Sequence, residues 1–157
     1  MPATWTETVG FLIADVHRLF RRRLEIELND AGLGITAGAA RVLAYAAVYR
    51  GLRQKDLAER MTVEPMTLVG YLDALEGEGL IERLPDPNDR RCKLIVVTKK
   101  AETTIERIRI IAGRIRAEAT EGLDEAEIAR LRGALLRMRD RLSGSTTGAR
   151  AAEELAE

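Results

Sequence analysis

Cysteine, histidine and aromatic residues are scarce in this 157-residue sequence, and each scarcity excludes a class of protein or site. The single cysteine, Cys92, cannot form an internal disulfide, which fits a reducing compartment. The single histidine, His17, cannot form a metal site or an acid–base pair alone, so we interpret it as an ordinary helix residue. Because aromatic residues make up only 4% of the chain, we expect an aliphatic core. We expect no cofactor and no metal.

Long apolar runs and catalytic motifs are also missing. The longest apolar run, residues 42–49, is far shorter than the roughly 20 residues that a bilayer requires. Glu7 and Asp15 lie near the N-terminus, and no basic segment precedes an apolar one there, as it would in a signal peptide. We find no nucleophile–base pair, phosphate-binding glycine loop or Cys/His cluster. The sequence therefore predicts a cytoplasmic protein that contacts no membrane and is not an enzyme.

The net charge is zero, with 25 basic and 25 acidic residues, whereas many DNA-binding domains are basic overall. The distribution of charge matters more than its total, because the local field at a docking surface decides association. Residues 81–100 carry six basic and three acidic side chains, a local net charge of +3. This segment is therefore a candidate docking surface for nucleic acid within a neutral chain.

The first half of the chain shows helical periodicity. Residues 8–28 place Leu12, Val16, Phe20 and Leu24 at steps of four, which gives one apolar helix face. A second helix is expected from a cap at Thr36 through residue 50, and its nearly continuous apolar surface indicates burial. Two short helices follow, residues 54–61 and a segment that starts near residue 65 and ends at residue 77 or 79. Their brief connection predicts a helix-turn-helix.

A strand, a basic turn and a second strand follow this motif, and helix, strand, basic loop, strand is the order of a winged helix. The turn contains residues 86–91 (DPNDRR), and residues 93–98 (KLIVVT) form the second strand. A long helix is expected from Thr98, with a break at Gly122 and a last helix capped by Asp124. The last helix carries apolar residues at alternating steps of three and four, which is typical of a helix–helix seam: Ile128, Leu131, Leu135, Met138 and Leu142.

The predicted fold is mainly α with a small antiparallel β-wing. We expect a single domain over residues 1–157, with a winged helix-turn-helix at residues 35–100. Helical dimerisation regions are expected at residues 5–32 and 101–143, and a linker-like tail at 144–157. The flanking helices carry more apolar surface than one small winged helix can cover, and a twofold homodimer is the simplest way to bury it.

Four segments resemble the MarR family of bacterial transcription regulators, nearest to its SlyA-like branch. They are residues 52–61 (LRQKDLAERM), 63–69 (VEPMTLV), 72–83 (LDALEGEGLIER) and 86–91 (DPNDRR). The resemblance covers about residues 35–100. It implies a homodimer that binds a palindromic operator, with a wing arginine of each subunit in a minor groove. Many members of this family respond to small aromatic acids or oxidants, which lower their affinity for DNA.

Candidate base contacts lie on the outer side of the recognition helix, which is expected to enter the major groove. They are Thr62, Met66, Thr67, Gly70 and Tyr71. Residues 62–80 contain no Lys or Arg, and Gly70 stands where SlyA-like relatives often carry an arginine. Because of this departure, we expect DNA recognition to depend more on the wing and on DNA shape than on direct base readout. Alternatively, Gly70 only permits close packing or close approach to DNA.

Arg90 and Arg91 at the tip of the wing are the strongest candidates for DNA contacts, since a narrow minor groove attracts arginine. Asp89 and Asp73 are candidates to hold Arg90 through an ion pair. The alternative is an ordinary turn with solvent-exposed charges. Phosphate contacts are expected from residues at the start of the first motif helix and on the second wing strand, namely Arg53, Gln54, Lys55 and Lys93. These residues are alternatively a solvated surface.

Two regulatory features remain open. Cys92 lies beside basic residues that can lower its pKa, so it is either a redox sensor or a packed strand residue. A ligand pocket is expected against the first, second and fifth helices, lined by Phe11, Arg18, Arg22, Tyr45 and Tyr49, whose arginines can pair with a carboxylate. These five residues are alternatively core aromatics and exposed arginines.

The sequence thus predicts a homodimeric, sequence-specific DNA-binding regulator, a repressor whose DNA affinity a small ligand modulates. The neutral charge and the acidic recognition helix leave a second hypothesis. In that alternative the chain is a winged-helix module for protein interaction or ligand capture, with weakened DNA readout.

Overall fold

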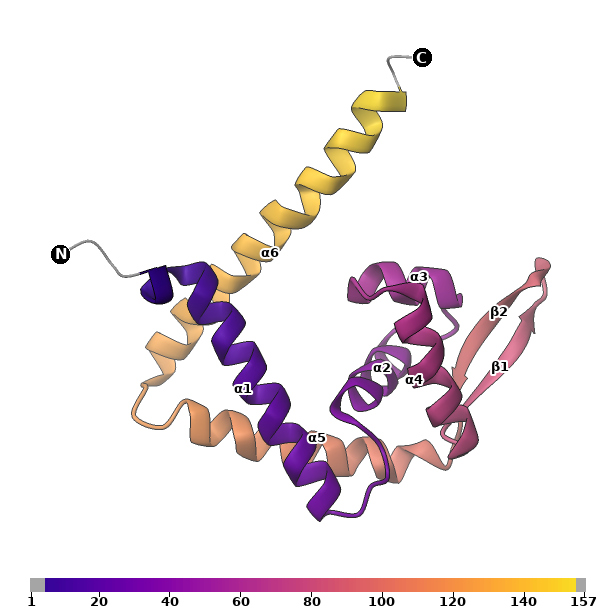
Figure 1. The fold of residues 1–157 in the computed structure, drawn as a ribbon, viewed down its shortest axis with the longest axis horizontal. Coiled ribbons are helices and arrows are strands. Elements are labelled where there is room, and N and C mark those ends of the chain that lie inside the picture. Colours follow the sequence, from indigo (N-terminus) through magenta and orange to yellow (C-terminus); the bar gives the residue numbers. More distant parts are fainter. Residues whose placement is uncertain (1–4, 155–157) are drawn as a thin grey trace. The chain divides into compact units, whose positions relative to one another are not determined.

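The computed structural model describes the backbone of residues 5–154 and the side chains of residues 5–143. Along this part of the chain, a short 3-10 helix (η1, Trp5–Glu7) precedes six α-helices and one two-stranded antiparallel sheet (Figure 1). The chain divides into two compact units, Met1–Arg116 and Ala117–Glu157. The predicted fold class, mainly α with a small β-wing, is confirmed.

The first two helices of unit 1 are α1 (Val9–Asp30) and α2 (Ala37–Val48). The Thr36 hydroxyl oxygen accepts a hydrogen bond from the Ala39 N–H at 3.2 Å, which confirms the predicted cap of α2. The Glu25 carboxylate of α1 adds a second cap by accepting from the Ala37 N–H at 2.6 Å. Helix α2 ends two residues before the predicted end at residue 50, and Gly51, with a φ of +69°, takes the left-handed turn that follows.

The helix-turn-helix consists of α3 (Gln54–Met61) and α4 (Pro65–Gly77). Thr62 adopts a left-handed conformation with a φ of +52°, which reverses the chain between the two helices. Pro65 occupies the first turn of α4, where a backbone N–H would have no hydrogen-bond partner within the helix. Leu68, Leu72 and Leu75 of α4 are fully buried, as their spacing predicts.

The core of unit 1 is aliphatic, as the low aromatic content predicts. Leu28 of α1, Val42 and Leu43 of α2 and Leu57 of α3 have no exposed surface, and they pack with the buried leucines of α4. Burying one such side chain stabilises the fold by about 1.5–3 kcal/mol. This core holds the recognition helix at a fixed position relative to α2 and α3.

The wing is a hairpin of β1 (Ile81–Asp86) and β2 (Asp89–Val97), with Ile81 opposite Val97 and a register shift at Pro85/Asp86 (Figure 1). Thr98 closes its base, because its N–H donates to the Leu80 carbonyl at 3.0 Å and its hydroxyl to the Gly79 carbonyl at 2.8 Å. These bonds hold Thr98 on the hairpin, so helix α5 (Ala101–Ala119) begins three residues later than predicted.

Helix α6 (Glu125–Glu154) forms most of unit 2. Gly122 has a φ of +87°, and Asp124 caps α6 by accepting from the Glu127 N–H at 2.7 Å, while the Glu127 carboxylate accepts from the Asp124 N–H at 2.9 Å. Both predictions for this turn are confirmed. A linker was predicted after Leu142, but the α6 backbone continues through it. Residues 155–157 of the predicted tail lie outside the described residues.

Within the described residues, no helix combines the length and the hydropathy that crossing a membrane requires.

Candidate nucleic-acid interface and adjoining cavities

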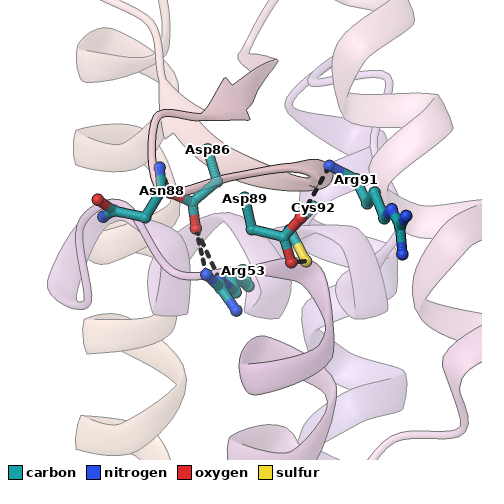
Figure 2. A network of polar contacts seen from close by, with 6 residues as sticks. All are labelled: Arg53, Asp86, Asn88, Asp89, Arg91 and Cys92. Atoms are coloured by element: carbon teal, nitrogen blue, oxygen red, sulfur yellow. Dashed lines mark hydrogen bonds and ion pairs between the residues drawn. The ribbon is translucent and has the colours of Figure 1, made fainter.

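An ion pair ties the tip of the wing to the start of α3. The Arg53 Nε and Nη2 atoms each lie 2.7 Å from Asp86 Oδ2, and Figure 2 shows the guanidinium directed at this carboxylate. The other oxygen, Oδ1, accepts from the Asn88 N–H at 2.8 Å and so orders the turn. Asp86 is 4% exposed, the one buried charged residue in the described part of the chain. A buried carboxylate with partners at both oxygens fixes local geometry.

The pKa values follow from these contacts. The Asn88 N–H and the Arg53 guanidinium hold the pKa of Asp86 below its ordinary value, although burial opposes them. The Asp86 carboxylate in turn raises the pKa of Arg53. The pair is therefore charged at neutral pH. Arg53 was predicted to contact phosphate, but in the structure its guanidinium is occupied by Asp86.

Backbone bonds reinforce the attachment of the wing to α3. The Ile95 N–H donates to the Leu52 carbonyl at 2.9 Å, and Arg53 forms a β-bridge with Leu94. Lys55, the second residue of α3, is exposed and its Nζ lies 3.8 Å from the Glu59 carboxylate, whereas Gln54 is half-buried. The wing and the start of α3 thus form one connected surface.

Asp89 does not brace Arg90 as predicted. Its Oδ1 accepts from the Arg91 N–H at 3.1 Å and its Oδ2 from the Cys92 thiol at 3.4 Å (Figure 2). Asp73, the other predicted partner, lies 2.7 Å from Arg83. The Arg90 and Arg91 side chains are exposed, as is Lys93. Asp89 therefore shapes the turn and leaves both arginines facing solvent.

The surroundings of Cys92 raise the pKa of its thiol. Its hydrogen bond to the Asp89 carboxylate raises its pKa, and partial burial acts in the same direction. A basic neighbour, Arg53, does lower this pKa, but the Asp89 carboxylate and burial outweigh it. Because the thiolate is the reactive form, this position favours the packing role over the sensing role.

The recognition helix presents few contact groups. Met66 is 81% exposed, and a Cβ added at Gly70 would meet open space. Thr67 is exposed but lines a cavity, as does Thr62. Tyr71 was predicted to be exposed, but it is half-buried over Gly38 of α2. A Cβ at position 38 would overlap the Tyr71 ring, so only glycine leaves room for it.

The sequence did not predict Arg83 of β1 as a site residue. Its guanidinium neutralises acidic side chains on α4. Its Nη1 lies 2.7 Å from the Asp73 carboxylate and 2.8 Å from the Glu76 carboxylate. Only 18% of the Arg83 side chain is exposed. Two of the acidic residues on the recognition helix are therefore compensated. The sequence signal was a lone arginine on a strand that directly follows an acidic helix.

An apolar cavity of about 630 Å³ lies against α1, α2 and α5, where the sequence predicts a ligand pocket. Phe20, Leu24 and Ile108 contribute to its apolar wall, and the α3–α4 turn and Tyr71 of α4 close one side. Its charged lining residues are Arg21, Arg41, Glu64 and Arg116. We call this space the apolar cavity.

A second cavity of about 520 Å³ is lined by Arg18, Arg21, Arg22, Glu25, Thr36 and Tyr71, and we call it the arginine cavity. It contains the two arginines that were predicted to bind a ligand. Phe11, Tyr45 and Tyr49 line neither cavity. The Tyr45 and Tyr49 rings instead contact each other at a tilt, with their centroids 5.9 Å apart. Their role as ligand contacts stays a prediction. In the described residues, no group of three or more His, Cys, Asp or Glu residues is placed to hold a metal ion.

Comparisons with known proteins agree with this geometry. Residues 35–93 match the model of the MarR family. The chain is 36% identical to transcriptional regulator PA3341, with a TM-score of 0.74, and the match covers 87% of this chain and 99% of that one. MarR from E. coli, solved in its apo form, is 30% identical with a TM-score of 0.72, and 83% and 96% of the two chains are covered.

The transcriptional regulator SlyA is 27% identical with a TM-score of 0.79, and the match covers 87% of this chain and 95% of that one. The winged helix-turn-helix, the match over residues 35–93 and 30% identity across almost all of E. coli MarR lead to one conclusion: this chain belongs to the MarR family of transcriptional regulators.

Proposed function

We propose that this regulator is a homodimeric repressor that binds a palindromic operator and whose DNA affinity is modulated by a small ligand. The observation that carries the proposal is the wing tip. Two exposed arginines, Arg90 and Arg91, stand on a turn that the Arg53–Asp86 ion pair fixes to the helix-turn-helix. A cationic tip held in one place relative to a recognition helix suits simultaneous contacts in a minor and a major groove.

The two elements would contribute different contacts. Arg90 or Arg91 would enter the minor groove, where negative potential is highest when the groove is narrow. Met66 would touch a thymine methyl, and Thr67 would donate to a base or phosphate. Lys55 and Lys93 would contact phosphates and set the register without reading sequence.

Exposed apolar surface supports the homodimer. Large apolar side chains along α1 are exposed, namely Val9, Phe11, Leu12, Ile13, Val16 and Leu19. The same holds for α6 at Ile128, Leu131, Leu135, Leu136, Met138 and Leu142. Each helix thus carries exposed apolar side chains that a partner would cover, and a second copy of the chain is the simplest partner.

The apolar cavity supports the ligand. Its volume of about 630 Å³ lies within the range of small-molecule sites. Arg21, Arg41 and Arg116 among its lining residues would pair with the carboxylate of an aromatic acid. Thr62, Val63, Glu64, Thr67 and Tyr71 form the wall on the recognition-helix side, so a ligand here would contact the element that touches DNA.

The alternative, a protein-interaction module, drew its support from the acidic recognition helix. In the structure Arg83 compensates Asp73 and Glu76, which weakens that support.

The test is a gel shift with DNA from upstream of the protein's own gene, at several salt concentrations. If each subunit neutralises about three to four phosphates, the logarithm of the association constant falls with the logarithm of the salt concentration, with a slope of about −6. Absence of binding, or a slope near zero, would contradict the proposal and favour the interaction module.

A further inference from the structure

We propose that the recognition helix α4 reads its operator through the 5-methyl group of a pyrimidine base, which Met66 contacts in the major groove. The helix would then accept thymine and 5-methylcytosine at this position and reject cytosine, so that methylation of a cytosine would create a recognised base. This inference rests on the proposed function and names the chemical group that α4 recognises.

The first observation is the kind of side chain that α4 lacks. Residues 62–80, from the α3–α4 turn to the start of the wing, contain no Arg, Lys, His, Asn or Gln. Arg and Lys donate hydrogen bonds to the O6 and N7 atoms of guanine, and Asn and Gln pair with the N6 and N7 atoms of adenine. Neither purine therefore finds its usual side-chain partner on this helix.

The second observation is what α4 presents instead. Met66 lies in the first turn of α4, the part of a recognition helix that contacts bases, and it is 81% exposed. Gly70 lies one turn further along the same face, and a Cβ there would meet nothing within 4 Å. No side chain at position 70 therefore limits the approach of Met66 to a base. The flexible thioether chain of methionine adapts its shape to an apolar group such as a methyl.

The third observation concerns the acidic residues, because a carboxylate can accept a hydrogen bond from N4 of cytosine. Both acidic residues within α4 are engaged by Arg83, whose Nη1 lies 2.7 Å from the Asp73 carboxylate and 2.8 Å from the Glu76 carboxylate. Glu64, which precedes the helix as its N-cap residue, lines the apolar cavity. Met66 therefore selects a base by apolar contact, without a neighbouring acidic residue of α4 that favours cytosine.

The experiment is a gel shift of the full chain with the duplex that it binds upstream of its own gene. Each thymine is replaced in turn, in both half-sites, by deoxyuridine, which keeps the hydrogen-bonding groups of thymine and lacks its methyl group. We expect at least one replacement to weaken wild-type binding about tenfold, which is about fourfold for each buried methyl group in a homodimer. The same replacement should leave the affinity of Met66→Ala unchanged. If no replacement weakens wild-type binding, the inference is wrong.

Four duplexes that differ only at this base pair then separate methyl recognition from hydrogen bonding. They carry thymine, deoxyuridine, cytosine or 5-methylcytosine, each with its complementary purine. We expect thymine and 5-methylcytosine to give similar affinities, and deoxyuridine and cytosine to bind about tenfold more weakly. An order that follows the hydrogen-bonding groups, with thymine equal to deoxyuridine and cytosine equal to 5-methylcytosine, would contradict the inference.

Two control variants separate Met66 from the rest of the surface. Val48→Ala removes another exposed apolar side chain, at the end of α2 and outside α4 and the wing, so it should keep the full difference among the four duplexes. Arg91→Ala should weaken binding to all four by the same factor, because the methyl group lies in the major groove and the wing is expected in the minor groove. Equal loss of methyl discrimination in Val48→Ala and Met66→Ala would contradict the inference.

Failure of this inference can be distinguished from failure of the proposed function. A wild type that binds no unmodified duplex would overturn the proposed function and this inference with it. A wild type that binds the unmodified duplex, with an affinity that deoxyuridine does not change, would overturn this inference alone.

Discussion

The wing and the recognition helix are adjoining parts of one motif, and their chemistry is opposite. The wing tip carries Arg90 and Arg91, both exposed, on a turn whose carboxylates are engaged in its own hydrogen bonds. Residues 62–80 contain no basic residue, and the exposed residues of α4 include Met66 and Gly70. In the proposed complex, electrostatic attraction to DNA would therefore come from the wing, and the helix would contribute shape and apolar contacts.

From this difference we infer that DNA binding depends on the position of the wing as well as on its charge. A hairpin is flexible unless it is tied down, and here the start of α3 holds it through Arg53 and Ile95. The helix-turn-helix thus serves partly as the support for the wing. Each of the following changes weakens or strengthens one side of the comparison.

The largest effect is expected from removing the wing charge. Arg90→Ala together with Arg91→Ala should lower operator affinity about a hundredfold or more, because each arginine contact contributes about 1–3 kcal/mol. The homodimer and the fold should be unchanged, since both side chains are exposed. Fluorescence anisotropy checks the affinity and circular dichroism the fold. Arg109→Ala on α5 is the control, and an equal loss there would indicate a nonspecific charge effect.

The next effect separates the position of the wing from its charge. Asp86→Asn removes a negative charge near DNA, so charge alone predicts tighter binding. It also breaks the ion pair with Arg53 that holds the turn, so positioning predicts weaker binding, by about tenfold. A gel shift distinguishes the two outcomes. Tighter binding would show that the loss of a negative charge outweighs the loss of wing positioning.

A smaller gain is expected from adding charge to the recognition helix. Gly70→Arg should raise operator affinity about three- to tenfold, because one more phosphate or base contact becomes available. A Cβ at position 70 would meet nothing within 4 Å, so a side chain can leave the backbone there without a clash. Gly70→Ala controls for the gain in helix propensity when this glycine is replaced. An unchanged affinity in Gly70→Arg would place this position away from the groove.

The smallest effect is a pH dependence. Asp86 has a lowered pKa in the folded state, so the stability it contributes is complete above its unfolded pKa and is lost as the pH falls through the lowered folded value. Thermal unfolding of the wild type and Asp86→Asn should differ by a constant amount from neutral pH down to about 4, and converge below it. A difference that persists into strong acid would show that Asp86 does not stabilise the fold as an anion.

Local patterns in the sequence were enough to predict most of the fold. The steps of three and four in α4, the cap at Thr36 and the break at Gly122 depend on residues close in sequence. The errors concern contacts between distant residues. Asp86 forms its ion pair with Arg53, which lies 33 positions away in the sequence. The Tyr71 ring of α4 has room only because the residue that faces it from α2, Gly38, has no side chain. No periodicity within one segment contains that information.

One measurement tests the central claim most directly, namely the fluorescence anisotropy of a labelled duplex from upstream of the protein's own gene. The Arg90→Ala, Arg91→Ala variant and the Met66→Ala, Thr67→Ala variant would be titrated against it side by side. The account predicts a loss of affinity for the wing variant that exceeds the loss for the helix variant by about tenfold or more. A larger loss for the helix variant would contradict it.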